Sequence, residues 1–161
     1  MVTRKNVASR ELKVHNRIFS INSILKAIKE KIKEQGYTYN EKKHVRKSGK
    51  YGEEAEAVLF GFKEVDDYTK AEVEVSLFFH NIKKIKYNNK DTDQGDAFIN
   101  IKYDWLKDYK NYWGTTKFNQ FLYKIYADTL MKEKHKALYK KKIQEEDREM
   151  LAMIKKEMRF E

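Results

Sequence analysis

Residues 71–79 read AEVEVSLFF and residues 97–105 read AFINIKYDW, and apolar and polar side chains alternate in both segments. One side of the first segment consists of Ala71, Val73, Val75, Leu77 and Phe79. A period of two residues is typical of a β-strand that buries one face. Residues 54–65 are also rich in strand-forming residues and precede the first segment by a short polar link. The stretch Glu54–Trp105 therefore predicts three consecutive antiparallel strands, with a longer polar loop over residues 88–96 between the second and the third.

The second side of these strands carries large aromatic residues, namely Phe60, Phe62, Phe78 and Phe98. Left to solvent, these rings would form a large exposed apolar patch. Either the protein's own helices cover this side, which is the favoured alternative, or the side meets a partner or ligand. Gly61, between two of the phenylalanines, predicts a bulge or the close approach of another part of the backbone.

The residues before the predicted sheet contain one clear helix. In residues 20–35, isoleucine and leucine recur at helical spacing, Ser20 can cap the first turn, and Gly36 follows the last turn. Residues 37–47 alternate weakly and predict a fourth strand. Residues 1–11 are polar and basic, and we expect them to form a flexible arm.

The C-terminal third predicts helices over residues 117–139 and 143–160, either as one long bent helix or as two shorter ones. The last segment carries an apolar stripe made of Met150, Leu151, Ile154 and Met158. We expect this stripe either to pack on the protein's own sheet, hiding part of the phenylalanine side, or to meet a second copy of the chain.

The predicted fold is thus a single α+β domain over residues 1–161. It has a four-stranded antiparallel meander, one N-terminal amphipathic helix, and one long or two shorter C-terminal helices. An alternative arrangement is a curved sheet wrapped on the C-terminal helix, enclosing an apolar-ligand cavity.

Composition narrows the classes of function. The 161 residues include no cysteine and no proline, so disulfides, thiol catalysis and thiolate metal sites are excluded. No apolar run is long enough for a membrane span, and we expect a cytoplasmic protein. The frequent use of Lys, Glu and Ile is thermophile-like.

Charge is distributed unevenly along the chain, which has a net charge of +10. Residues 1–52 hold 14 basic and 4 acidic residues, whereas residues 53–106 hold 7 basic and 12 acidic ones. A basic cluster in the predicted fourth strand and its turn consists of Lys42, Lys43, His44, Arg46, Lys47 and Lys50. Together with nearby tyrosines, it predicts a polyanion-binding site, because phosphates need several cations and bases stack on aromatic rings. The alternative is an edge strand whose lysines prevent aggregation.

We find no recognised catalytic, metal-binding or cofactor-binding motif. The four histidines are scattered along the sequence, and His80 is expected to be structural. Glu54 and Glu56 can line up with Glu72 and Glu74 across a hairpin, as carboxylates do in two-metal hydrolases, but no basic partner lies on the same strand. We therefore expect a protein without cofactors that is not an enzyme.

Two resemblances accompany these patterns. The order of helix, three strands and helix resembles the double-stranded-RNA-binding domain, although Lys117-Phe-Asn-Gln stands where that family has its Lys-Lys-x-Ala-Lys signature. Asp67-Tyr68, Gly95, Asp108-Tyr109 with Trp113, and the helical Phe121-Leu122 pair resemble a family of small basic archaeal proteins of uncharacterised function. The second resemblance implies one domain and an archaeal setting, and no activity.

The sequence leaves two main functional hypotheses and a lesser one. The first is a non-enzymatic binding module for nucleic acid or another polyanion. The second is an assembly or scaffold protein that self-associates through its C-terminal helix and aromatic sheet face. Binding of an apolar ligand is the third.

Overall fold

The computed structural model describes residues 2–50, 52–65, 69–107, 110, 116–129 and 134–158, and the side chains of 123, 126–129 and 134–138 are not included in that description. Eight elements follow one another along the chain. They are β1 (Thr3–Phe19), α1 (Ile21–Glu34), β2 (Thr38–Gly49), β3 (Gly52–Glu64), β4 (Thr69–Tyr87), β5 (Lys90–Lys107), α2 (Lys117–Thr129) and α3 (Lys134–Glu157).

The sheet has five antiparallel strands in the order β1-β5-β4-β3-β2, so the prediction of a four-stranded meander is wrong. The missed strand is β1, which includes most of the residues expected to form a flexible arm. β1 pairs with β5 along nearly its whole length, from Thr3 opposite Lys107 to Phe19 opposite Asp93. It is an edge strand whose side chains are mostly exposed, so its sequence lacks the apolar alternation that identifies the central strands.

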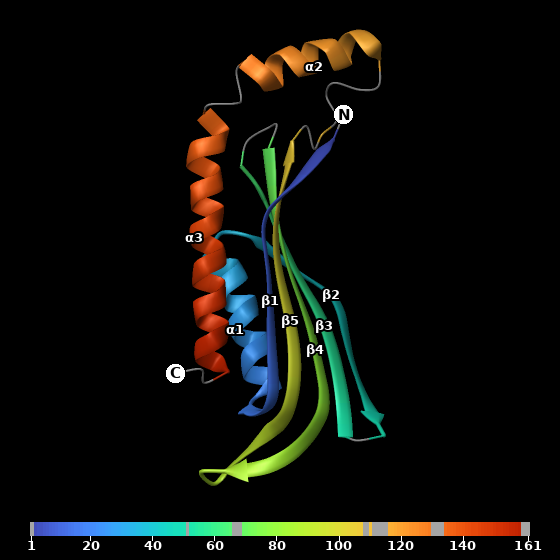
Figure 1. Ribbon diagram of the computed structural model, residues 1–161, viewed down its shortest axis with the longest axis vertical. Coiled ribbons are helices and arrows are strands. Elements are labelled where there is room, and N and C mark those ends of the chain that lie inside the picture. The colour runs from blue at the N-terminus through green and yellow to red at the C-terminus, as the bar shows by residue number, and fades with distance from the viewer. Residues whose placement is uncertain are drawn as a thin grey trace.

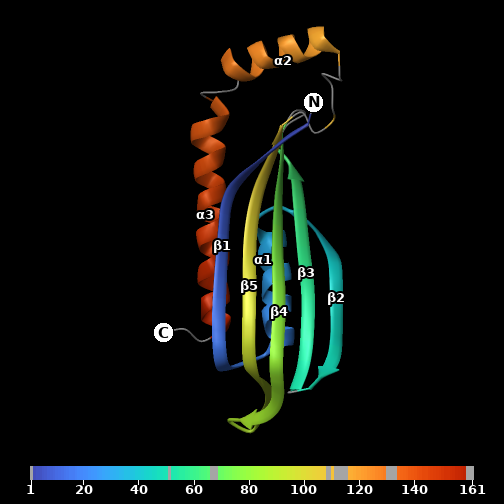
Figure 2. The same cartoon turned by 45° about the vertical axis from the view of Figure 1, so that its right-hand side comes forward.

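Helices α1 and α3 lie on the same face of the curved sheet, and neither lies on the opposite face (Figures 1 and 2). We call these the inner and outer faces. The inner face carries the buried alternating residues of β3, β4 and β5. The outer face carries the phenylalanines, which α1 and α3 do not cover. The expectation that the protein's own helices hide this side is therefore wrong for these two helices.

Helix α1 has the predicted boundaries and the predicted apolar stripe. The Ser20 hydroxyl accepts a hydrogen bond from the Ser23 amide, and Gly36 follows the helix with a φ of 88°. Four isoleucines of the stripe are almost completely buried: Ile21, Ile24, Ile28 and Ile32. A Cβ built on Gly61 of β3 would lie 2.6 Å from Ile32 Cγ2, so this glycine permits the close approach of helix to sheet.

The apolar stripe of α3 packs in cis on the inner face. Met150, Ile154 and Met158 are buried in the same core as α1, and Leu151 is partly buried against it. The stripe covers the inner side of the sheet and leaves the phenylalanine side free, because the alternation in β3 to β5 separates these two sides. α2 and α3 are separate elements, but α3 runs without a break through residues 140–142, so the predicted boundary between the two C-terminal helices is wrong.

Buried polar groups hold α3 in place. Glu146 Oε1 lies 2.6 Å from Lys63 Nζ, and its Oε2 accepts a hydrogen bond from the Tyr37 hydroxyl at 2.7 Å. The next residue, Asp147, pairs with Arg10 of β1. Each buried carboxylate thus meets a cation from a different strand, which fixes how α3 lies on the sheet.

Strands β4 and β5 continue past the other strands as a two-stranded hairpin (Figure 1). The hairpin closes with the two-residue turn Asn88-Asn89, whose φ angles of 51° and 60° are those of a type I′ turn. A long polar loop was expected over residues 88–96, but residues 90–96 belong to β5. Asparagine tolerates the left-handed conformation that this turn requires, which explains a tight turn without glycine.

Candidate functional site

The predicted basic cluster lies on the exposed edge strand β2 and at its end, as its sequence indicates. Five of its six members, however, contact a carboxylate. The pairs and their nitrogen–oxygen distances are Lys42–Glu74 at 3.2 Å, Lys43–Glu56 at 3.0 Å, His44–Glu41 at 3.1 Å, Arg46–Glu53 at 2.6 Å and Lys47–Glu54 at 3.6 Å. The acidic residues of β3 and β4 therefore balance the basic residues of β2.

On the outer face, lysines also make cation–π contacts with the phenylalanine rings. Lys42 Nζ is 4.1 Å from the centre of the Phe60 ring, and Lys70 Nζ is 4.5 Å from that of Phe62. Such cation–π contacts partly shield the rings from water. Phe78 is the most exposed of the four predicted phenylalanines, at 38%.

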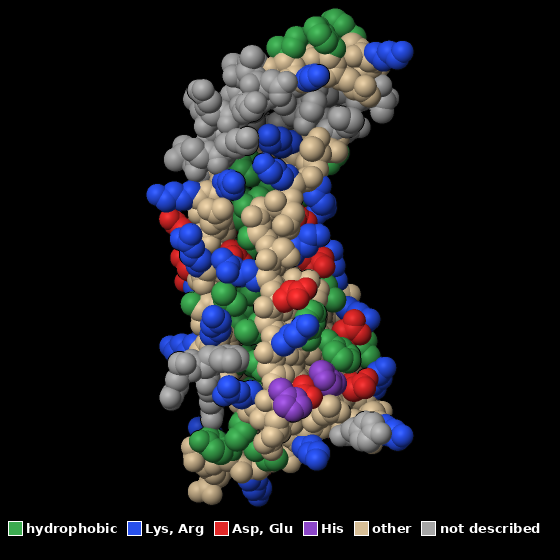
Figure 3. All heavy atoms as spheres, viewed as in Figure 1, with side chains coloured by type: hydrophobic (Ala, Val, Ile, Leu, Met, Phe, Trp, Pro, Cys, Tyr) green, Lys and Arg blue, Asp and Glu red, His purple; other side chains and the backbone are tan. Residues whose placement is uncertain are grey.

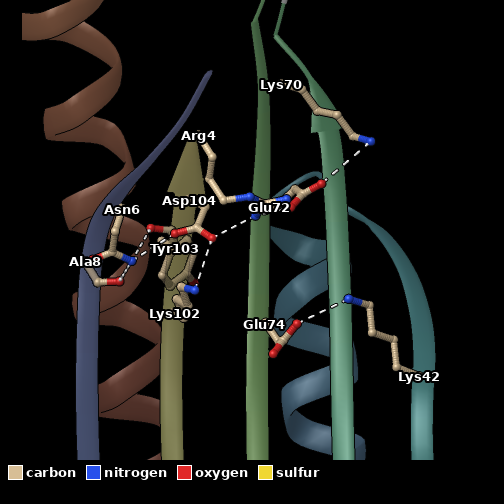
Figure 4. Close-up of polar contacts among 10 residues, drawn as sticks. All are labelled: Arg4, Asn6, Ala8, Lys42, Lys70, Glu72, Glu74, Lys102, Tyr103 and Asp104. Atoms are coloured by element: carbon tan, nitrogen blue, oxygen red, sulfur yellow. Dashed lines mark hydrogen bonds and ion pairs between the residues drawn. The ribbon is translucent and has the colours of Figure 1, made fainter. Parts of the chain in front are cut away.

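The acidic residues of the outer face do not line up as the two-metal hypothesis requires. Glu72 lies opposite Phe62 on one side and opposite Asp104 on the other. Arg4 Nη1 bridges these two carboxylates at 2.8 Å from each, as Figure 4 shows. The bridge attaches the start of β1 to the centre of the sheet, and we interpret it as a structural contact.

The β4–β5 hairpin carries a second basic cluster, which we call the hairpin lysines. Its members are Lys83, Lys84, Lys86 and Lys90. All four side chains are exposed, and within the described residues none of them has a carboxylate within ion-pair distance. No acidic residue occurs between His80 and Lys90. Lys84 and Lys86 lie opposite Asp93 and Asp91 of β5 in the strand register, so the hairpin lysines have carboxylates nearby but are not held in ion-pair contact with them.

An open pocket of about 450 Å³ lies where the hairpin meets the start of α1. Lys84, Lys86 and Arg46 contribute cations to its wall, and Asp91 and Asp93 contribute carboxylates. The Ile21 amide at the start of α1 donates a hydrogen bond to Asp93 Oδ2 at 3.2 Å. Arg46 Nη2 lies 2.6 Å from Glu53 Oε2 and 3.9 Å from Asp93 Oδ1, so carboxylates already balance its charge, and the lysines are the cations of this pocket without an ion-pair partner among the described residues.

Two β-bulges lie opposite each other at the base of the hairpin. One interrupts β1 between Val14 and Arg17, and the other interrupts β4 between His80 and Lys83. Each contains or adjoins a His-Asn pair, His15-Asn16 or His80-Asn81, and both asparagines have a positive φ, 50° and 54°. Bulges and non-glycine residues with positive φ often occur beside functional sites.

Both His-Asn pairs contact Asp96, which lies between them on β5. Its Oδ1 lies 2.8 Å from His15 Nδ1 and accepts a hydrogen bond from the Asn16 amide at 2.8 Å. Its Oδ2 lies 3.3 Å from His80 Nε2 and accepts a hydrogen bond from Asn81 Nδ2 at 3.0 Å. We call these five residues the Asp96 cluster. Figure 3 shows imidazole groups with acidic atoms between them on the viewed face.

A carboxylate only accepts hydrogen bonds, so His15 Nδ1 and His80 Nε2 carry protons. Burial by itself would raise the pKa of Asp96, but the donors from Asn16 and Asn81 and the nearby imidazoles outweigh burial, and the pKa lies below its usual range. Asp96 is therefore ionised at neutral pH. Among the described residues, no group of three or more His, Cys, Asp or Glu is arranged to hold a metal ion.

Sequence reasoning missed both the hairpin lysines and the Asp96 cluster. The lysines stood in a region expected to be partly loop, and the histidines looked scattered because 65 positions separate His15 from His80. A usable signal existed: the dipeptide His-Asn occurs twice in the sequence, the second time directly after the predicted strand 71–79. A polar pair that interrupts strand alternation indicates a bulge.

No known protein family matches the chain, and no curated protein sequence is significantly similar to it. These comparisons therefore add no support to the two sequence resemblances. Among the described helices, none is long and apolar enough to cross a membrane.

Proposed function

We propose that the protein is a non-enzymatic module that binds nucleic acid through the β4–β5 hairpin. The observation that supports this proposal most directly is the contrast between the two basic clusters. Cations of β2 already contact carboxylates, whereas the hairpin lysines form no ion pair with any residue that the structure describes. A phosphate group that approaches β2 meets cations that already contact Glu54, Glu56 and Glu74, whereas at the hairpin it meets lysines without such contacts, with Asp91 and Asp93 as the nearby carboxylates.

The shape of the hairpin also suits a nucleic acid. It is a two-stranded ribbon that extends beyond the sheet (Figure 1), and the major groove of a DNA duplex can admit such a ribbon. Tyr87, which is 42% exposed near the tip, offers an aromatic ring beside the lysines. Four lysines over eight residues provide the multiple phosphate contacts on which electrostatic binding depends.

The proposal is tested with two charge-neutralising variants of the full chain. The hairpin variant changes Lys83, Lys84, Lys86 and Lys90 to Gln. The matched β2 variant changes Lys42, Lys43, Arg46 and Lys47 to Gln. It removes the same number of positive charges from the basic cluster that the sequence predicts to bind polyanions. Fluorescence anisotropy measures binding of a labelled 20-base-pair duplex and a 20-nucleotide single strand at low salt.

The hairpin variant is expected to lose about tenfold or more in affinity, and the β2 variant to retain the wild-type affinity within about twofold. All eight positions are exposed, so thermal melts of both variants should show a folded protein. Loss of binding in the β2 variant alone would favour polyanion binding by the β2 cluster. If the wild-type protein binds neither the duplex nor the single strand, nucleic-acid binding is refuted.

A second candidate function is assembly, and one observation favours it. Helix α2 exposes four apolar side chains at helical spacing: Phe118, Phe121, Leu122 and Ile125. The stripe of α3 is buried in cis, so we infer that α2, in place of α3, pairs with α2 of a second copy. The small area of one short helix predicts a weak dimer, because stable interfaces bury about 1,200 Å² or more. Sedimentation of wild type and Phe121→Glu tests this: wild type should dimerise at high concentration and the variant should not.

A further inference from the structure

We infer that the pocket above the Asp96 cluster is a binding subsite for a single phosphate group, in which His15 and Lys83 contact the anion. This inference rests on the proposed function and names the part of the site that recognises one phosphate individually. Three observations support the inference: the geometry of the Asp96 cluster, the open pocket beside this cluster, and the different surroundings of the two imidazoles.

The pocket is open, has a volume of about 510 Å³ and lies at the base of the hairpin. The residues that line it are His15, Asn16, Asn81, Lys83, Gln94, Gly95 and Asp96. Asp96 is 7% exposed and the two oxygens of its carboxylate receive four nitrogen contacts, so little of its hydrogen-bonding capacity is left for a ligand. The lining also includes nitrogen donors that suit an anion, namely the His15 imidazole, the Lys83 ammonium and the side-chain amide of Gln94.

His15 is the imidazole that can bind an anion. Its Nδ1 is held by Asp96 at 2.8 Å, and 88% of its side chain is exposed, so its Nε2 is accessible to a ligand. When His15 is protonated, Nε2 donates a charge-assisted hydrogen bond while Asp96 keeps the ring in position. The hydrogen bond to Asp96 reduces the freedom that the ring loses when it binds an anion.

The role of His80 differs from that of His15. Its Nε2 contacts Asp96, its ring stacks on Phe78 with 5.3 Å between centroids, and its Nδ1 is buried without a hydrogen-bond partner in the described structure. Protonation of Nδ1 would bury an unpaired donor, which is costly. His80 is therefore a positioning residue that orients Asp96, and it does not contact the anion.

The charged groups around His15 determine how anion binding changes with pH. Asp96 of β5 and Lys83 and His80 of β4 surround it, and Lys13 and Arg17 flank it on β1. From β3, the carboxylates of Glu53 and Glu54 are paired with β2. Asp96 and Lys83 keep their charges near neutral pH, so protonation of His15 changes the net charge of these three groups from zero to +1. Anion affinity should therefore rise as the pH falls from 8 to 5.5.

The test uses sulfate as the probe, because its charge stays constant over this pH range, whereas that of inorganic phosphate does not. Histidine Cε1–H signals of the full chain are followed by NMR during sulfate titrations at pH 5.5 and pH 8 and constant ionic strength. Variants His15→Gln and His80→Gln are compared with His44→Gln, a matched control in which the histidine also faces a carboxylate, Glu41.

Wild type and His44→Gln should bind sulfate about tenfold more tightly at pH 5.5 than at pH 8, with the largest shift at His15. His15→Gln should abolish this difference, whereas His80→Gln should retain a pH-dependent response. An unchanged pH dependence in His15→Gln, or no sulfate-induced shift at His15 in wild type, would overturn the subsite. Neither result depends on the anisotropy assay, so failure of the subsite and failure of nucleic-acid binding are distinguishable.

Discussion

His15 on β1 and His80 on β4 are separated by an entire strand, yet both imidazoles bind the same carboxylate, that of Asp96 on β5. The consequence is that one side chain joins three strands at the position where the hairpin leaves the sheet. The two bulges, each with an asparagine of positive φ, make this arrangement possible because they turn their His-Asn pairs toward β5.

Asp96→Asn should destabilise the protein by about 1–3 kcal/mol at pH 7. An amide has only one accepting oxygen, so the new NH₂ group must face one of the two donor pairs, either that of His15 and Asn16 or that of His80 and Asn81. Urea unfolding followed by circular dichroism measures the change. An unaltered unfolding midpoint would show that the cluster does not join the strands energetically.

The stability difference between wild type and Asp96→Asn should depend on pH. The pKa of Asp96 is lowered in the folded protein, so its contribution to stability is fully present above the unfolded-state value of about 3.9. The contribution is lost as the pH falls through the lower folded-state pKa. The stability difference between wild type and Asp96→Asn should therefore shrink in strongly acidic solution, and a difference that grows below pH 4 would contradict this assignment.

Gly61→Ala should destabilise the protein by about 1–3 kcal/mol. The added Cβ would lie 2.6 Å from Ile32 Cγ2 and 2.9 Å from Tyr37 Cβ, so α1 would have to move away from β3. Thermal unfolding of the variant measures the effect. A variant as stable as wild type would mean that the helix can shift without loss of packing.

Glu146→Ala should cost about 3–5 kcal/mol, because it leaves Lys63 buried without its carboxylate and removes the acceptor of the Tyr37 hydroxyl. Glu149→Ala is the matched control on the same helix. The Glu149 side chain is 57% exposed and lies 3.8 Å from Lys31, so its removal should change stability by less than about 1 kcal/mol. Equal effects in chemical denaturation would contradict a specific role of the buried pair.

Much of the fold could be predicted from the sequence where burial is one-sided. The alternation in β3, β4 and β5 and the isoleucine stripe of α1 follow directly from their buried faces, and the structure contains these four elements, although β4 and β5 are longer than predicted. Gly61 was expected to mark a bulge or a close approach, and it marks a close approach. The strand β1 could not be found in the same way, because most of its side chains are exposed and its sequence shows no apolar alternation. It is recognisable as a strand only through its pairing with β5.

The candidate site was harder to predict because it depends on register. Lys42 and Lys47 looked like free cations until β3 and β4 brought Glu74 and Glu54 beside them. The lysine-rich segment 83–90 looked less important because the Asn-Asn turn was not recognised as a hairpin tip. His15 and His80 meet only through pairing of their strands with β5, which no local pattern reveals.

The measurement that tests the central claim most directly is the dependence of duplex affinity on salt concentration. Each phosphate contact made by a cation contributes about −0.9 to the slope of log K against log salt concentration. If the four hairpin lysines contact phosphates, the slope for the Lys83, Lys84, Lys86 and Lys90 variant should be shallower than that of wild type by about 3 to 4. The Lys42, Lys43, Arg46 and Lys47 variant should keep the wild-type slope. Equal slopes for the hairpin variant and wild type would contradict the claim that the β4–β5 hairpin binds nucleic acid.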